Sequence, residues 1–466
     1  MKRTILALLL VAAIVPLGVR SSAATFVGTS SNPNNQFTAA ADFNTVAVAL
    51  ADPGTPLRGT VGLTAAATSG RGMASVVFQS SPAGMGTWTN ICTDLSTPFS
   101  CSFDTTTVTD GLRDLRAVAT DSAGYSRTDT VTNRRIDNSL PVVAVNDPGS
   151  PLTGTVTVSG TAVDSGSGLA SVKLQYGSGG VWTDICTQAS SPISCAWNTT
   201  SLADGLYDLR TQATDAAGNS ATSTIVSNRR VDNTAPTVTV TDPGAFLRGS
   251  ITLQSTSSDG AGSGVQSVRY EYKPSAGSIW TTACTGASTP FSCAWNTTGV
   301  ADGLYDVRAV ATDGVAKVTT SAAVTSRRID NAVPTAVTLN AVATPLQGSV
   351  TLSGTATDAG SGIASVRFQT APAGTGTWSD ACTDTTTPYS CAFDTTTVAD
   401  ALYDFRALAT DQAGNTTASA TQTNRRIDNN GPTVAVTDPG PYLRGTVTIS
   451  DTAADPAGVQ SVTLQY

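Results

Sequence analysis

Apolar and polar residues alternate over short stretches of this chain, and Gly, Pro, Asp and Ser separate those stretches. From Thr155 to Ser159 the order is polar, apolar, polar, apolar, polar, which is typical of a strand with one buried and one wet face. Residues 206–213 keep no strict parity, which predicts a bulge. In residues 139–233 we predict strands at 142–145, 155–162, 169–176, 181–187, 194–199, 207–213 and 221–230. About seven short strands in such a segment predict an Ig-like β-sandwich.

The segment is one copy of a repeat. The phrase Asn-Arg-Arg-Ile-Asp-Asn occurs at 133–138 and 424–429, with variants at 228–233 and 326–331. The copies predict domains at 46–138, 139–233, 234–331 and 332–429, followed by a truncated fifth domain at 430–466. We therefore expect either a fragment of a longer protein or a last segment that cannot close a core. A strand of nine residues is about 30 Å long, so four domains end to end predict a rod of about 120–150 Å.

Four short motifs carry a resemblance to a known family. They are Ser-Gly-Leu-Ala-Ser-Val at 167–172, Asp-Gly-Leu-Tyr-Asp-Leu-Arg at 204–210, Ala-Thr-Asp-Ala-Ala-Gly-Asn at 213–219 and Asp-Asn-Thr-Ala-Pro at 232–236. With these motifs the chain resembles tandem bacterial Ig-like domains of exported proteins over 46–466. The resemblance implies an all-β chain of tandem Ig-like β-sandwich domains, arranged like beads on a string. It also implies a secreted or surface repeat protein, an adhesin stalk, or the accessory region of a secreted enzyme.

The first residues predict export. Met1-Lys2-Arg3 precedes an apolar run at 5–19, and small residues follow at 21–24. A run of about 15 apolar residues is shorter than the roughly 20 that span a bilayer, so we predict a signal peptide at 1–24 and an extension at 25–45. An uncleaved anchor helix is the alternative. We expect a secreted or extracellular surface protein that has no transmembrane segment after signal cleavage.

Composition narrows the function. The chain has no histidine, and Glu271 is the one glutamate among 34 acidic residues, so imidazole-based catalysis and imidazole zinc ligands are excluded. A net charge of −8 disfavours sequence-independent nucleic-acid binding, and we expect no nucleic-acid partner. Charged residues are only 13% of the chain, about half the usual share, and the scarcity of Glu and Lys argues against helices.

Eight cysteines fall in four pairs, and each pair encloses eight residues. Even numbers in an exported chain favour disulfides, and closing a loop of about ten residues stabilises a domain by roughly 2.5–3 kcal/mol. Metal binding fits poorly, because further Cys or His ligands are missing from the sequence. We predict the bridges Cys92–Cys101, Cys186–Cys195, Cys284–Cys293 and Cys382–Cys391.

Aromatic residues recur at fixed places in the repeat. Tyr207, Tyr305 and Tyr403 resemble the tyrosine corner of sandwich domains, and the first unit has Arg113 instead. One tryptophan precedes each first cysteine, and one aromatic residue follows each second cysteine: Trp88, Trp182, Trp280 and Trp378, then Phe103, Trp197, Trp295 and Phe393. Packing over the disulfide and sheet is the interpretation we favour. Stacking on a carbohydrate is the alternative, so a sugar or a surface protein is the partner class we consider.

Aspartates recur in turns and at the ends of the units. We consider two roles for them, a calcium site at each domain end and plain turn formation through bonds to the backbone. The glutamates of cadherin junctions, which share some of these motifs, are lacking here. The candidate calcium ligands are Asp121, Asp137, Asp164, Asp215, Asp232, Asp259, Asp313, Asp330, Asp358, Asp411 and Asp428. Calcium is the one cofactor we consider.

Arginine pairs end the last strand of each unit, at 134/135, 229/230, 327/328 and 425/426. Neighbours on a strand point to opposite faces, so we expect one of each pair to bridge a turn or linker aspartate. For the whole chain we expect a non-enzymatic exported repeat protein that acts as a surface stalk or adhesin-type spacer. The alternative is the accessory region of a larger secreted hydrolase whose catalytic domain lies beyond residue 466.

Overall fold

The computed structural model describes residues 45–465. The predicted signal peptide 1–24, and the extension 25–45 except its last residue, lie outside this part of the chain. Strands dominate the described residues, and the short helices there are of the 3-10 type: η1 (Thr105–Thr107), η2 (Thr297–Gly299) and η3 (Thr395–Thr397). Within residues 45–465, no helix has the length and apolar character needed to cross a bilayer.

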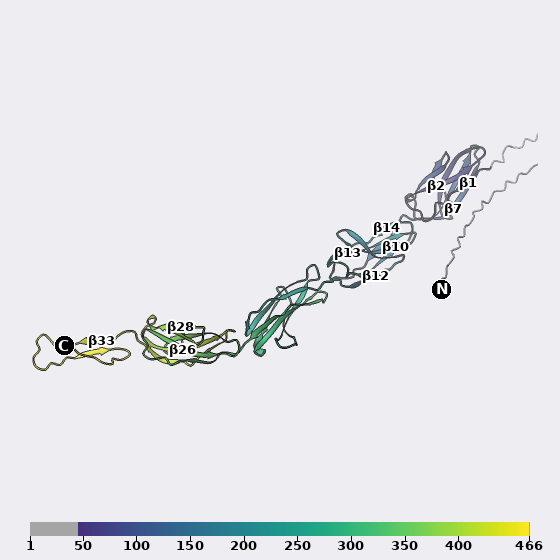
Figure 1. Ribbon diagram of the computed structural model, residues 1–466. Coiled ribbons are helices and arrows are strands. Elements are labelled where there is room, and N and C mark those ends of the chain that lie inside the picture. Colours follow the sequence, from purple (N-terminus) through teal and green to yellow (C-terminus); the bar gives the residue numbers. More distant parts are fainter. Residues whose placement is uncertain (1–44, 466) are drawn as a thin grey trace, which may run out of the picture. The chain divides into compact units, whose positions relative to one another are not determined.

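Two sheets form the second sandwich. One sheet has the order β12-β9-β8, and the other has the order β11-β10-β13-β14, with β15 also paired to β13. The strands are β8 (Val142–Val145), β9 (Thr155–Val163), β10 (Leu169–Ser178), β11 (Val181–Gln188), β12 (Ile193–Asn198), β13 (Gly205–Asp215), β14 (Ser220–Thr222) and β15 (Val226–Val231). Figure 1 shows these strands as facing layers. The Ig-like β-sandwich that the alternating pattern predicts is confirmed.

The predicted strand at 221–230 is wrong in one respect, because the chain leaves the sheet between β14 and β15. The Ser223 N–H donates to the Thr211 carbonyl at 2.8 Å, and the Thr211 N–H donates to Ser223 Oγ at 3.0 Å. This side-chain bond takes the place of a ladder bond and divides the strand. The expected bulge is present in β13, where the register with β15 shifts between Tyr207 and Leu209.

The other sandwiches repeat the same plan of a three-stranded sheet facing a larger sheet. The first contains β1 (Ala47–Leu50), β2 (Thr60–Thr68), β3 (Met73–Pro82), β4 (Thr89–Asp94), β5 (Phe99–Asp104), β6 (Gly111–Asp121) and β7 (Ser126–Ile136). The third contains β16 (Thr237–Val240), β17 (Phe246–Leu247), β18 (Ser250–Ser258), β19 (Val265–Pro274), β20 (Thr281–Gly286), β21 (Ser292–Asn296), β22 (Gly303–Asp313), β23 (Val318–Thr320) and β24 (Val324–Ile329). The fourth contains β25 (Thr335–Leu339), β26 (Ser349–Thr357), β27 (Ile363–Pro372), β28 (Ser379–Asp384), β29 (Ser390–Asp394), β30 (Ala401–Asp411), β31 (Thr416–Ala418) and β32 (Gln422–Ile427).

The core of each sandwich lies between its sheets and comes from alternate strand positions. In the second sandwich Val172 and Leu174 of β10 and Leu209 of β13 have no exposed surface, and Val158 and Trp197 face them from the smaller sheet. Burying each such side chain stabilises the fold by about 1.5–3 kcal/mol. Corresponding clusters fill the third and fourth sandwiches. The polar residues between them face water, as the period-two pattern requires.

A parallel contact joins an early segment of each sandwich to the end of its last strand. Leu57 pairs with Ile136, Leu152 with Val231 and Leu346 with Ile427, while β17 pairs with β24. Each leucine carbonyl accepts from the N–H of the aspartate that follows the last strand; the Asp137–Leu57 and Asp232–Leu152 bonds measure 3.0 and 2.8 Å. The end of the last strand, up to that aspartate, is therefore tied to an early segment of the same sandwich.

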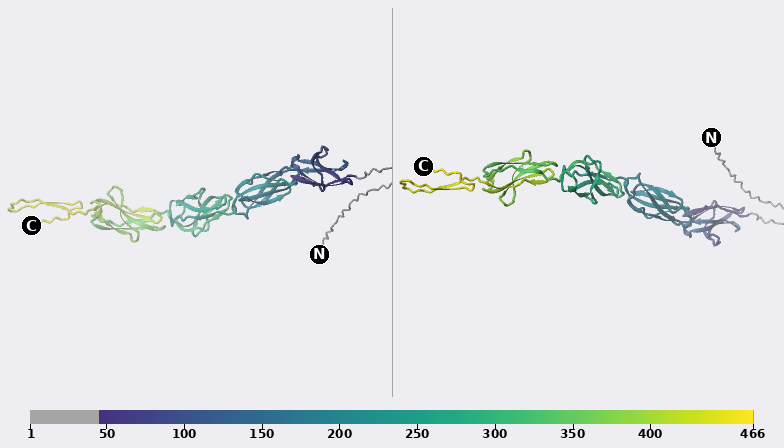
Figure 2. Two further views of the ribbon diagram at one scale, coloured as in Figure 1. Left: turned by 90° about the horizontal axis from the view of Figure 1, so that it is seen from above. Right: turned by 90° about the horizontal axis from the view of Figure 1, so that it is seen from below.

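The C-terminal segment differs from the sandwiches. Within the described residues it forms one antiparallel pair, β33 (Thr433–Val436) with β34 (Asp451–Ala454). Figures 1 and 2 show it in yellow as a single layer. Val434 and Val436 are 55% and 57% exposed, whereas the matching strand of the third sandwich ends on the buried Val240.

Candidate functional site

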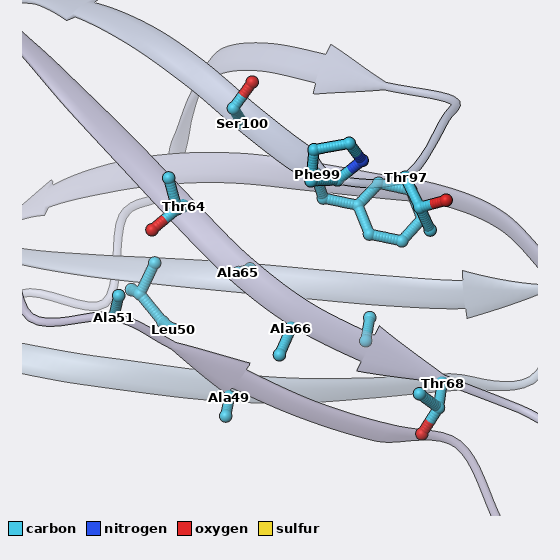
Figure 3. A pocket seen from close by; sticks show the side chains of 12 residues that line it. Ala49, Leu50, Ala51, Thr64, Ala65, Ala66, Thr68, Thr97, Phe99 and Ser100 are labelled. Atoms are coloured by element: carbon cyan, nitrogen blue, oxygen red, sulfur yellow. The ribbon is translucent and has the colours of Figure 1, made fainter.

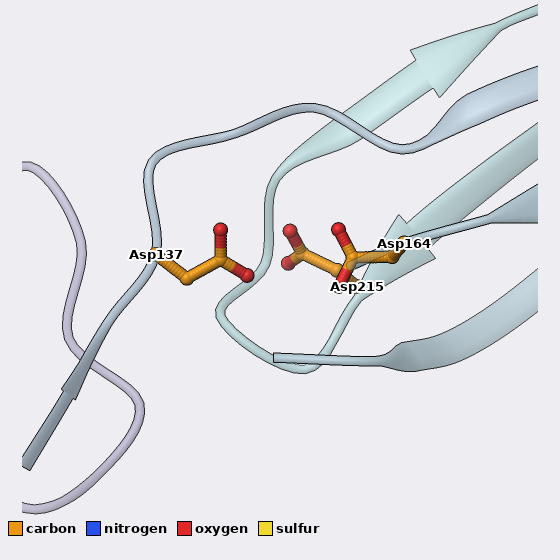
Figure 4. A group of neighbouring side chains, drawn as sticks. All are labelled: Asp137, Asp164 and Asp215. Carbon is orange, nitrogen blue, oxygen red and sulfur yellow. The ribbon is translucent and has the colours of Figure 1, made fainter. Parts of the chain in front are cut away.

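Three groups of aspartates lie where one sandwich follows another. We call them the first, middle and last junction triads: Asp137, Asp164 and Asp215; Asp232, Asp259 and Asp313; Asp330, Asp358 and Asp411. In each triad, one carboxylate oxygen per residue lies within 4.8 Å of the others. Figure 4 shows the carboxylates of the first triad converging. Eleven aspartates are candidate ligands by their sequence, and the structure places nine of them in these three groups.

Each triad draws on two consecutive sandwiches. Its first aspartate comes directly after the last strand of the preceding sandwich, as Asp137 does after β7. The second follows the middle strand of the three-stranded sheet of the next sandwich, and the third ends a long strand of that sandwich; Asp164 follows β9, and Asp215 ends β13. The first and third aspartates are buried and the second is half-buried. Three carboxylates that share one small space repel each other unless a positive charge or a proton joins them.

Backbone N–H groups position these carboxylates. Asp137 accepts from the Ser167 and Ser139 N–H groups at 2.6 and 3.2 Å, and Asp164 accepts from the Gly168 N–H at 2.6 Å. Asp215 accepts from the Asn219 N–H at 2.7 Å. These bonds are the turn chemistry expected of aspartate, and they also hold the acids with their oxygens directed toward one another. The two roles considered for these residues are therefore compatible.

A glycine makes room for the first aspartate of every triad. A Cβ on Gly166 would lie 2.3–2.4 Å from the Asp137 carboxylate, and a Cβ on Gly360 would lie 2.4 Å from that of Asp330. In the middle triad a Cβ on Gly262 would lie 2.5 Å from Asp259 Oδ2 and 3.0 Å from Asp232 Oδ1. Real Cβ atoms do not approach oxygens so closely, so only glycine fits these positions.

An asparagine completes the first and last triads. Asn219 Nδ2 donates to Asp215 Oδ2 at 2.7 Å and to the Asp137 carbonyl at 2.9 Å. Asn415 Nδ2 makes the same two bonds, to Asp411 Oδ2 at 2.8 Å and to the Asp330 carbonyl at 3.0 Å. The amide thus ties the preceding sandwich to the third aspartate of the next. Sequence reasoning missed these asparagines, although the repeat alignment places them four residues after that aspartate.

The middle triad lacks this amide, because Lys317 occupies the corresponding position. Three of its buried carboxylate oxygens have no hydrogen-bond partner among the described residues: Asp232 Oδ1, Asp259 Oδ1 and Asp313 Oδ2. Burial raises the pKa of Asp259, and the negative charges of Asp232 and Asp313 raise it further. The hydrogen bond from the Gly264 N–H lowers it, but the net shift is upward. The donor set consists of hard oxygens, and it fits a divalent cation such as Ca²⁺.

The repeat also agrees with a family model. A model for the bacterial Ig domain matches residues 141–210, 236–309 and 340–417. A second model, for the bacterial Ig-like domain of group 3, matches residues 192–257. The chain is a tandem repeat of bacterial Ig-like domains. The triads thus lie where successive Ig-like domains follow one another, and the resemblance seen in the repeat motifs is confirmed.

Two solved structures are similar to this chain. A tetra-tandem repeat in the extending region of a large adhesion protein is 21% identical, with a TM-score of 0.29, and the match covers 82% of this chain and 99% of that one. A bacterial ice-binding adhesin is 17% identical, with a TM-score of 0.28, and the match covers 62% of this chain and 98% of that one. No curated protein sequence matches the chain.

Two candidate aspartates lie outside the triads. Asp121 of the first Ig-like domain accepts from Ser69 Oγ at 3.2 Å, and Arg71 Nη1 lies 3.6 Å from its Oδ2. Burial alone would raise the pKa of Asp121, but N–H donors from Tyr125 and Ala123 hold it below its usual value. Asp428 faces Asp455; burial and that neighbouring charge raise its pKa. Neither residue belongs to a group of three aspartates. Asp121 has a serine and the positive charge of Arg71 beside it, and Asp428 has one other aspartate.

The cysteines of each Ig-like domain are bonded to each other. Cys186 lies on β11 and Cys195 on β12, so the bond joins edge strands of the two facing sheets. The same pairing occurs in the other three domains, as Cys92–Cys101, Cys284–Cys293 and Cys382–Cys391. Each bond closes the open side of one sandwich.

The tyrosines make the expected tie. Tyr207 and Tyr305 hydroxyls donate to the carbonyls of Ala203 and Ala301, at 3.0 and 2.9 Å. Burial raises the pKa of both phenols. Tyr403 is 9% exposed at the corresponding position. The loops before β13 and β22 are thus held to those strands.

The aromatic rings pack rather than face solvent freely. The rings that follow the second cysteines are buried, with 2–5% exposure: Phe103, Trp197, Trp295 and Phe393. Each half-buried tryptophan has an arginine guanidinium 4.0–4.2 Å from its ring centroid: Trp88 with Arg116, Trp182 with Arg210, Trp280 with Arg308 and Trp378 with Arg406. One face of every indole is therefore occupied, which favours the packing interpretation over sugar stacking.

In three of the four doublets the first arginine bridges a turn aspartate near the start of the same domain. Arg134 lies 2.9 Å from Asp52, and Arg327 lies 2.9 Å from Asp242. Arg229 and Asp147 are 3.4 Å apart. Such partly exposed pairs contribute little stability, about 0–1 kcal/mol, and they serve to fix geometry.

A shallow hollow of about 640 Å³ lies on the first Ig-like domain. Ala49 and Leu50 of β1, Ala66 of β2 and Phe99 of β5 line it, together with threonines and a proline (Figure 3). Its lining contains no titratable side chain. The hollow thus offers mainly apolar surface with a few hydroxyl groups.

Proposed function

We propose that this chain is a non-enzymatic, exported repeat protein that acts as a stalk or spacer at the bacterial cell surface. The observation that supports this most directly is the repetition of the junction. Three successive domain ends present an aspartate that meets two aspartates of the next domain, with a glycine packed against them, so the chemistry of the chain is concentrated in connections between domains. Four disulfides fit an oxidising extracellular location.

Each junction triad serves in this proposal as a calcium site. Calcium takes oxygen ligands from carboxylates and carbonyls, and it neutralises acids that otherwise repel one another. The unpartnered oxygens of the middle triad and the glycine that makes room for its acids support this role. A bound ion would hold the first aspartate, from one domain, to two loops of the next. The stalk would then bend less at each junction.

Cell labelling, solution scattering and calcium binding test the proposal. An antibody against the Ig-like repeats should label intact cells of the source bacterium, and a signal only after lysis would contradict surface exposure. Small-angle scattering of the oxidised, mature chain in calcium should give a maximum dimension of at least about 120 Å, which is four domains end to end. A compact particle would contradict the stalk. Calorimetric titration with CaCl₂ should show binding, and identical melting with calcium and with a chelator would reject the calcium role.

A further inference from the structure

We propose that the three junctions are not equivalent, and that the middle triad is the one whose order depends on a divalent cation. This inference rests on the calcium role proposed above, and it assigns different behaviour to chemically similar sites. The middle triad consists of Asp232, Asp259 and Asp313. Calcium would fix the loop at 259–264 there, whereas the first and last junctions would stay ordered without it.

In the first and last triads an asparagine supplies hydrogen bonds to the third aspartate. Both oxygens of Asp215 accept bonds, one from the Asn219 N–H and one from its amide. Both oxygens of Asp137 accept N–H groups, from Ser139 and Ser167. The Asn219 amide also reaches the Asp137 carbonyl and so links the two domains directly. The last triad repeats these bonds through Asn415. At these junctions a neutral amide therefore donates to a triad carboxylate and links the two domains, as a bound cation would.

The middle junction has Lys317 where the other two junctions have an asparagine. Lys317 keeps the backbone bond to Asp313 Oδ1 at 2.8 Å, but its ammonium donates to Thr153 Oγ1 at 2.8 Å. Asp313 Oδ2 is left without a partner, and so are one oxygen of Asp232 and one of Asp259. Asp232 and Asp313 have no exposed surface, so water cannot readily replace the missing donor. The vacant acceptors therefore call for a cation or a proton.

A smaller neighbouring side chain lets the middle junction accommodate the lysine. In the first junction the guanidinium of Arg58 lies against the Asp215 turn; a Cβ on Gly218 would be 3.3 Å from its Nε. Arg248 occupies the same position against Gly414 in the last junction. The repeat places Thr153 at the corresponding position of the middle junction, and its short side chain leaves the space that Lys317 fills. The middle junction thus has Lys317 in place of the amide, and Arg230 Nη1 also donates to the Ala261 and Gly262 carbonyls of its loop. Neither cation is a hydrogen-bond partner of the three unpartnered carboxylate oxygens.

Hydrogen–deuterium exchange of the oxidised chain tests the inference. Peptides covering 164–168, 259–264 and 358–362 are followed after chelation and after addition of CaCl₂. At a calcium concentration about ten times the Kd, opening of the 259–264 loop should be suppressed about tenfold. Exchange in the other two loops should change less than about threefold, because their order does not require the ion. Equal protection of all three loops would overturn the inference while leaving junction calcium intact.

Two variants sharpen the test. Lys317→Asn restores the amide, so the 259–264 loop should be protected without calcium and should respond to it weakly. The transplant Arg248→Thr with Asn415→Lys copies the middle pair into the last junction, and it should make the 358–362 loop calcium-dependent. If neither variant shifts the calcium response, the amide does not decide it and the inference is wrong. No calcium effect in any loop would remove the calcium role as well, yet leave the surface-labelling result unaffected.

Discussion

The fit between Gly166 and Asp137 yields a quantitative prediction for Gly166→Ala. The added Cβ would lie 2.3–2.4 Å from three atoms of the Asp137 carboxylate. Contacts between heavy atoms are optimal near 3.5–4.0 Å, so the carboxylate must move by about 1 Å. That movement breaks the 2.6 Å bond from the Ser167 N–H and weakens the 3.2 Å bond from the Ser139 N–H.

The magnitude follows from those two bonds. A hydrogen bond to a charged acceptor contributes about 1.5–3 kcal/mol, so losing one or both costs about 1.5–6 kcal/mol. Alanine restricts the unfolded chain more than glycine does, which offsets about 0.4–1 kcal/mol of this loss. We expect the first junction to lose about 0.5–5.6 kcal/mol of local stability. Because 1.4 kcal/mol is a factor of ten, amide exchange in this loop should accelerate at least about twofold, and about 100-fold near the middle of that range.

Local exchange is the appropriate assay, since a chain of several domains does not unfold in one two-state step. Peptides covering 137–145 and 164–170 are compared between the variant and the unmodified chain. Gly62→Ala is the matched control, because a Cβ there would meet nothing within 4 Å. The control should exchange at the original rate. If Gly166→Ala stays within about twofold of the unmodified chain, the carboxylate does not hold this loop and the reasoning fails.

Three further predictions concern other parts of the fold. Replacing Cys186 and Cys195 together by alanine should destabilise the second domain by roughly 2.5–3 kcal/mol, measured as loss of exchange protection in β11 and β12. Tyr305→Phe should cost about 1 kcal/mol, visible as faster exchange at 301–305 in the third domain and not in the second. The raised pKa of Asp259 means that its folded form binds a proton more tightly than its unfolded form, so its contribution to stability is present below the unfolded pKa and is lost as pH rises through the folded pKa. Without calcium, the 259–264 loop should therefore gain protection, relative to intrinsic exchange rates, on going from about pH 7 to about pH 4.5, and Asp259→Asn should remove that gain.

The period-two pattern was sufficient to predict most of the fold, because alternation reports directly which face of a strand is buried. The predicted strand at 142–145 coincides with β8, and the predicted 155–162 differs from β9 by one residue. The interruption between β14 and β15 could not be predicted in this way. It depends on Ser223 pairing with Thr211, twelve residues away, and a serine in a polar strand gives no local sign of such a bond.

The triads show a similar division. Repetition alone singled out the aspartates, but it could not distinguish Asp121 from Asp215, which occupy the same position in their domains. The difference lies outside that position, since the first domain has Ser69 where the second has Asp164. The amide of Asn219 was missed because its partners, Asp215 and the Asp137 carbonyl, come together only when consecutive domains are in place.

The parallel contact at the end of each last strand has a mechanical consequence. Tension on the chain enters a domain near its first strand and leaves through the aspartate after its last strand. The parallel bonds at Leu152, to the Arg230 carbonyl and from the Asp232 N–H, then resist sliding together, because a pull in opposite directions loads them in shear. Asp232 belongs by its backbone to this clamp and by its carboxylate to the middle triad. The force that stretches one domain must therefore pass through the residue that anchors the next.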